Sequence, residues 1–62
     1  MKEYKYEYDI KIICDNGNEY LYFIEADYDD DAISVAKEFF SDDYSYEIVV
    51  ATEIIERREL DE

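Results

Sequence analysis

The chain has 62 residues, of which 19 are acidic and six are basic, and its formal net charge is −13. A chain of this length makes one domain with a small core, because it buries only about 60% of the surface that its unfolded form exposes. The charge argues against DNA, RNA and anionic membranes as direct ligands, since their phosphates would repel the protein. It suits a basic partner, and it would equally serve solubility.

Residues 3–14 alternate between apolar and charged side chains, which predicts a strand. Ile10 and Ile12 belong to its apolar face, and Asp9 and Lys11 belong to its charged face. The sequence Asp-Asn-Gly-Asn at 15–18 follows, and Asn-Gly is a strong hairpin signal. We therefore expect a hairpin whose second strand covers residues 19–26.

The register of this hairpin has two possible solutions. A two-residue turn would bring Leu21 and Phe23 to the side of Ile10 and Ile12. A three-residue loop with a bulge would instead bring the alternate residues of the second strand to that side, namely Tyr20, Tyr22 and Ile24. In both registers, one face of the second strand keeps apolar side chains that a single helix on the other face cannot cover.

Residues 28–41 have the apolar spacing of an amphipathic helix. The stripe consists of Ala32, Ile33, Ala36, Phe39 and Phe40. Asp27 or Asp29 can cap its N-terminus, and the acids at 29–31 suit the positive end of the helix dipole. The Ser-Asp-Asp sequence at 41–43 predicts its end.

Residues 44–55 return to an alternating pattern and predict a third strand, and residues 57–62 form a charged tail that we expect to be frayed or briefly helical. The residues on one face of this strand are Tyr44, Tyr46, Ile48, Val50 and Ile54. The order β-β-α-β predicts an α+β fold with a three-stranded antiparallel sheet in the order 2-1-3 and the helix on one face. The expected core consists of Ile10, Ile12, Ile33, Ala36, Phe40, Ile48 and Val50.

Catalysis has little support in this sequence. There is no histidine to activate the single cysteine, Cys14, whose place in a strand suggests a small buried hydrophobe. The chain shows no signal peptide, linker or apolar stretch of the ~20 residues that span a bilayer. We therefore expect one domain over residues 1–62, in a reducing cytoplasm, that is not an enzyme and uses no cofactor.

Four acidic residues match part of a calcium-binding loop. Asp27, Asp29, Asp31 and Glu38 occupy the first, third, fifth and twelfth positions of an EF-hand. Ala32 stands where the sharp turn of that loop requires glycine. We therefore expect no specific metal site, and leave open weak binding of divalent ions at millimolar concentration.

Two features point to a protein partner. Tyrosine is favoured at interfaces, and either Tyr20 and Tyr22 or Leu21 and Phe23 must lie on the uncovered face of the sheet. That face could bind a partner or form a homodimer. The second feature is a set of carboxylates around the helix that could imitate the phosphates of a nucleic acid: Asp29, Asp30, Asp31, Asp42 and Asp43.

In its size, its charge of −13, its richness in Tyr, Asp, Ile and Glu, and its hairpin-helix-strand pattern, the chain resembles small acidic proteins of bacteriophages and mobile elements. These include anti-CRISPR proteins and other DNA-mimic inhibitors. The resemblance rests on no motif, so it assigns no residue. It implies an inhibitor that occupies the basic groove of a nucleic-acid-handling protein, such as a CRISPR effector, in a bacterial host's cytoplasm. The alternative is an interaction domain that self-associates through the open sheet face.

Overall fold

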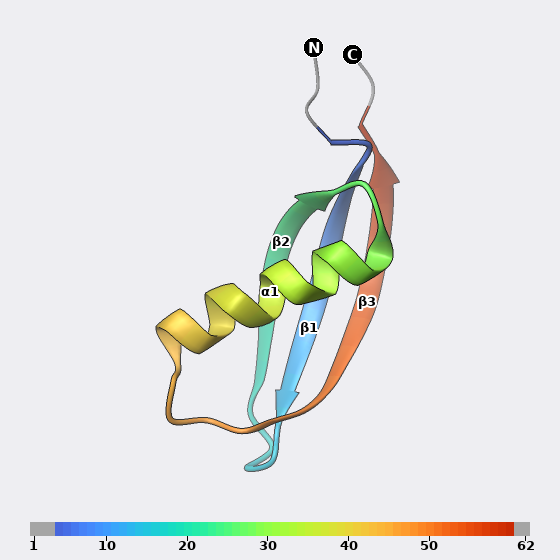
Figure 1. Cartoon of the computed structure of the whole chain (residues 1–62). Helices are drawn as coiled ribbons and strands as arrows, with labels where there is room; N and C mark the ends of the chain where they lie inside the picture. The colour runs from blue at the N-terminus through green and yellow to red at the C-terminus, as the bar shows by residue number, and fades with distance from the viewer. Residues whose placement is uncertain (1–3, 61–62) are drawn as a thin grey trace.

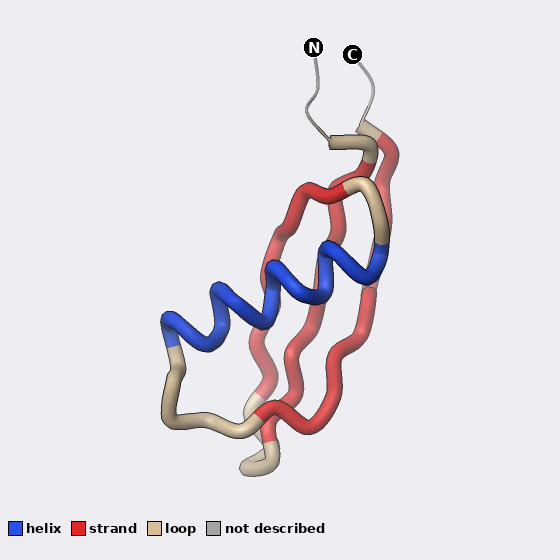
Figure 2. The backbone as a smooth tube through the Cα atoms, in the orientation of Figure 1, coloured by secondary structure: helices blue, strands red, loops and turns tan. Residues whose placement is uncertain are grey.

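A computed structural model describes residues 4–60. They form β1 (Tyr6–Cys14), β2 (Glu19–Ala26), α1 (Asp29–Asp43) and β3 (Val49–Glu59). The strands make one antiparallel sheet in the order β2-β1-β3, and α1 crosses one face of it, over β2 and β1 (Figures 1 and 2). The predicted α+β fold, its β-β-α-β order and its sheet order are confirmed.

The hairpin adopts the register of the three-residue loop. Ile10 pairs with Tyr22, and Ile12 pairs with Tyr20. The Gly17 N–H donates to the Cys14 carbonyl at 3.0 Å, and the φ angle of Gly17 is 89°, in the left-handed region that glycine enters at little cost. This turn geometry brings Tyr20 and Tyr22 to the side of the sheet that α1 covers.

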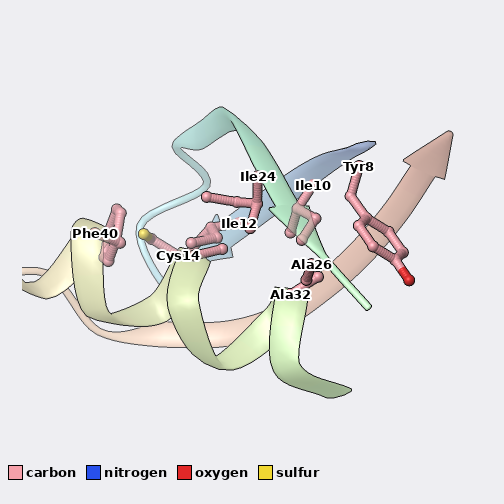
Figure 3. Packing of buried hydrophobic residues seen from close by; sticks show 9 residues of the cluster. Tyr8, Ile10, Ile12, Cys14, Ile24, Ala26, Ala32 and Phe40 are labelled. Atoms are coloured by element: carbon pink, nitrogen blue, oxygen red, sulfur yellow. The ribbon is translucent and has the colours of Figure 1, made fainter. Parts of the chain in front are cut away.

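The core is one layer of side chains between α1 and the sheet (Figure 3). Ala32 and Ala36 are the small side chains that let the helix approach the strands, and Phe40 fills the wider space near Cys14. The buried residues are Tyr8, Ile10, Ile12, Cys14, Ile24, Ala26, Ala32, Ala36 and Phe40. Four of the predicted core residues are therefore confirmed, and Ile33 is half-buried at the flank of the helix.

The third strand lies later in the chain than we predicted. Residues 44–48 form a loop, and β3 begins at Val49. Arg57, Arg58 and Glu59, which we had assigned to a frayed or helical tail, pair with the first residues of β1. Leu60 of the predicted tail donates its N–H to the Lys5 carbonyl at 2.9 Å, and residues 61–62 lie outside the described residues.

Ile48 and Val50 are not core residues, because they are 62% and 60% exposed. Cys14 pairs with Val49 and Ile13 pairs with Ala51, so that Val50 is an extra residue in a β-bulge. The bulge reverses the alternation, and Val49 instead of Val50 packs against the core. Ile48 precedes the strand, and its carbonyl accepts a hydrogen bond from the Asp15 N–H at 3.0 Å.

The prediction that Asp27 or Asp29 caps α1 is also wrong. The N-cap residue is Tyr28, whose side chain makes no capping hydrogen bond. Asp27 accepts a hydrogen bond from the Lys5 N–H at 2.9 Å, and Asp29 is inside the first turn. The acids at 29–31 still favour the helix through its dipole.

Within residues 4–60, no helix has both the length and the apolar character needed to cross a bilayer.

Candidate protein-binding surface

Three tyrosine hydroxyls on the covered side of the sheet each donate a hydrogen bond to a carboxylate at one end of α1 or in the loop after it. The pairs are Tyr8 with Asp29 at 2.8 Å, Tyr22 with Asp43 at 3.0 Å, and Tyr20 with Glu47. Burial and the neighbouring carboxylate raise the pKa of Tyr8 and of Tyr22 to about 12. The hydrogen bond to Glu47, together with burial, raises the pKa of Tyr20 to about 12. These bonds tie both ends of α1 to the sheet.

Tyr20 and Tyr22 therefore do not lie on the open face, where we had considered placing them as partner-binding residues. Their ring centroids lie 5.3 Å and 6.4 Å from that of Phe40, under the last turns of α1. The hairpin register is the physical reason, because it sends the alternate residues, Leu21 and Phe23, to the open face. Both of these are exposed.

The five aspartates predicted as the acidic site separate into two groups. Asp29 and Asp43 hold Tyr8 and Tyr22, and Asp29 also lies 3.4 Å from Arg57. The other three are Asp30, Asp31 and Asp42. They are exposed, and no ion pair within residues 4–60 joins them to a lysine or arginine. All five are exposed, and within residues 4–60 the two groups differ in that only Asp29 and Asp43 accept a hydrogen bond from a tyrosine.

Asp31, Glu38 and Asp42 lie on one side of α1, because they are seven and four residues apart. At the helical rise of 1.5 Å per residue, the row extends about 16 Å along the helix axis. The helix as a whole has six carboxylates and one basic residue, Lys37. Asp42 opposes the helix dipole in the last turn, and it repels Glu38 one turn earlier. A cation supplied by a partner would relieve both effects.

Two basic side chains of the sheet, Arg58 and Lys11, pair with carboxylates of the strands. Arg58 lies 2.9 Å from Glu7, 2.7 Å from Asp9 and 3.2 Å from Glu56. Its hydrogen bonds lower the pKa of the Asp9 carboxyl below its usual value. Lys11 pairs with Glu19 at 3.5 Å. Two of the five basic residues of the described chain, Lys11 and Arg58, therefore pair with carboxylates of the strands, and Arg57 pairs with Asp29 of α1. The outer side of α1 stays strongly negative.

The open face of the sheet is mixed in character. Its central strand presents Glu7, Asp9 and Lys11 there. Large exposed apolar side chains lie on both edge strands, Leu21 and Phe23 on β2 and Val50 and Ile55 on β3. Covering this face with a second copy would desolvate the charged row of β1, which is costly unless each charge is paired.

A groove of about 390 Å³ lies where the outer side of β2 meets α1. Its apolar lining is formed by Tyr4, Phe23, Ile24, Ala26, Val35 and Phe39. Three carboxylates complete the lining: Glu25, Asp27 and Asp31. The groove has no signal in the sequence, because it depends on where the helix crosses the strand.

Among residues 4–60, the cysteine is not exposed and no metal centre is apparent. Cys14 is buried, and burial raises the pKa of its thiol. No group of three or more histidine, cysteine or carboxylate side chains in this part of the chain could hold a metal ion. The partial EF-hand pattern is not gathered around one point, because Asp27 and Asp29 bind other groups and Glu38 lies about 10 Å along the helix from Asp31.

No known protein family, curated protein or solved structure matches this chain. The geometry of its own surface therefore carries the functional conclusion.

Proposed function

We propose that this protein is an acidic inhibitor that binds in the basic groove of a nucleic-acid-handling protein and takes the place of DNA or RNA there. A CRISPR effector is one such target. The observation that carries the proposal is the exposed carboxylate surface of α1, which has no ion pair to a basic residue at Asp30, Asp31 or Asp42 within the described chain. The tyrosine–carboxylate bonds hold this helix at both ends, so its charges are presented in a fixed arrangement.

Self-association through the open sheet face is the second candidate, because Leu21 and Phe23 are exposed there. The charged row of β1 beside them makes it the weaker one. Sedimentation at high protein concentration separates the two. A dimer that persists at high salt and is lost in Phe23→Asp would favour the second candidate, since apolar contacts strengthen when salt rises.

The first step of the test is capture. The immobilised protein is exposed to bacterial lysate at about 0.1 M and about 1 M salt, and the retained proteins are identified. We expect nucleic-acid-binding proteins at low salt that are lost at high salt, because screening weakens contacts between exposed charges. Retention of no such protein would contradict the proposal.

The second step is competition with a purified captured protein. Wild type should displace its DNA or guide RNA at low salt. A triple variant, Asp30→Asn, Asp31→Asn and Asp42→Asn, should bind more weakly by about 0.6–3 kcal/mol, from about 0.2–1 kcal/mol per exposed ion pair. That corresponds to about threefold to 150-fold in affinity. Asp29 and Asp43 are left intact because they hold tyrosines of the fold.

The matched control removes three exposed carboxylates away from α1, by Asp15→Asn, Glu53→Gln and Glu59→Gln. Both variants have the same net charge. If the control loses as much affinity as the α1 variant, net charge alone drives binding, and the helix is not the binding surface.

A further inference from the structure

The outer edge of β2 has the properties of a strand-binding site. No strand within residues 4–60 pairs with it, and β2 pairs with β1 through eight successive residues without a register shift. The opposite edge strand, β3, has two register shifts along its pairing with β1. Bulges protect an edge strand from pairing with other chains, so β3 is protected in this way and β2 is not.

The hydrogen-bonding pattern of the hairpin shows which backbone groups this edge offers. The Cys14 N–H donates to the Asn18 carbonyl at 2.9 Å, so Cys14 and Asn18 form a hydrogen-bonded pair. Such pairs alternate in an antiparallel ladder. The N–H and C=O groups of Leu21, Phe23 and Glu25 therefore point away from β1, toward the position of a fourth strand.

The helix extends over that position. In Figures 1 and 2, the C-terminal half of α1 continues past β2, the outer strand of the sheet. Val35 and Phe39, one helical turn apart, line the groove beside β2, and Phe39 is 51% exposed. An apolar helix stripe beside an unpaired strand edge would cover one face of an added strand.

The negative charge around the β2 edge favours a basic partner. Glu25, Asp27 and Asp31 line the groove around the apolar residues. A second copy of this chain would bring another net charge of −13 to the same place. Because two chains with the same large net charge repel each other, a basic segment fits this edge and a second copy does not.

We propose that β2 binds an extended basic segment of the partner protein as a fourth strand of the sheet. Apolar side chains on one face of the segment lie against Val35 and Phe39, and the alternating lysine or arginine side chains lie on the side of Glu25. The partner's backbone pairs with the outward N–H and C=O groups of β2. This inference rests on the proposed function in requiring a basic protein partner. It adds that the partner is held by an extended basic segment.

The probe is a fluorescent synthetic peptide of about seven residues, the length of an ordinary strand, with alternating valine and lysine. Its control is the same peptide with alternate backbone nitrogens methylated, which keeps the charge and removes ladder donors. Fluorescence anisotropy should show binding of the first peptide and at least about tenfold weaker binding of the second. Equal binding of the two would overturn the proposal, because it would show charge attraction without strand pairing.

Hydrogen exchange by NMR locates the contact on the protein. Bound peptide should slow the exchange of the Leu21, Phe23 and Glu25 amides. It should leave the exchange of the Ile54 amide unchanged. This amide lies on the opposite edge of the sheet and points away from β1, because its pairing partner Ile10 directs its own backbone hydrogen bonds to β2. Unchanged exchange at β2, or slowing of the β2 amides by self-association without peptide, would overturn the proposal.

Two alanine variants test the role of the helix. Phe39→Ala should weaken peptide binding about tenfold, whereas Tyr46→Ala should not change it, because Tyr46 is 79% exposed and does not line the groove. Equal effects of the two would refute the role assigned to α1. These results are independent of the competition experiment, which could succeed without strand addition or fail although the peptide binds.

Discussion

Replacing Phe40 by alanine should remove most of the stability of this domain. Its side chain is 2% exposed, and its ring centroid lies 5.3 Å from those of both Tyr20 and Tyr44. Truncating a buried phenylalanine costs about 3–5 kcal/mol. We expect the upper part of this range, because each aromatic neighbour also loses a contact of about 0.5–1.5 kcal/mol. A chain of 62 residues has a total stability of roughly 3–9 kcal/mol.

The assay is urea denaturation followed by far-ultraviolet circular dichroism. The matched control is Phe39→Ala, which makes the same change one residue earlier in α1, at a side chain that is 51% exposed. We expect Phe39→Ala to cost less than about 1 kcal/mol, a small fraction of the Phe40→Ala loss. Equal losses in the two variants would refute the assignment of Phe40 to the core and of Phe39 to the groove.

Loss of a negative charge should have opposite effects on stability at the two ends of α1, because the helix dipole favours an acid at its N-terminus only. In urea denaturation, Asp30→Asn should destabilise the domain by about 0.3–1 kcal/mol, and Asp42→Asn should stabilise it by a similar amount. A common sign would contradict this. The stability that Tyr20 and Tyr22 contribute should be constant from neutral pH to about pH 10 and should be lost between pH 10 and about 12, because both keep in the folded state a proton that the unfolded chain releases. Replacing either tyrosine by phenylalanine should reduce that alkaline loss, and an unchanged profile would argue against the hydroxyl–carboxylate bonds. Calcium titration by calorimetry should show no tight site, and a micromolar dissociation constant abolished by Glu38→Gln would be contrary to this expectation.

Among the surface predictions, the exposure of Asp30, Asp31 and Asp42 could be inferred from their positions in a short acidic helix. The roles of Asp29 and Asp43 could not. Each carboxylate meets a tyrosine 21 residues away in the chain, and no local pattern records that distance. Likewise, the groove beside β2 combines residues of a strand and a helix whose crossing point depends on core packing.

The order of the elements, the antiparallel sheet and the face of β1 that enters the core follow from periodicity, because alternating and helical spacings are local properties of the chain. Gly17 also indicated a turn, although both loop lengths fit its sequence. Only the tertiary structure decided the register, and with it the burial of Tyr20 and the exposure of Phe23. It also decided the position of β3, since a bulge at Val50 reverses the alternation. These choices depend on which side chains fill the space between one helix and three strands, and that competition is settled by packing across the whole core.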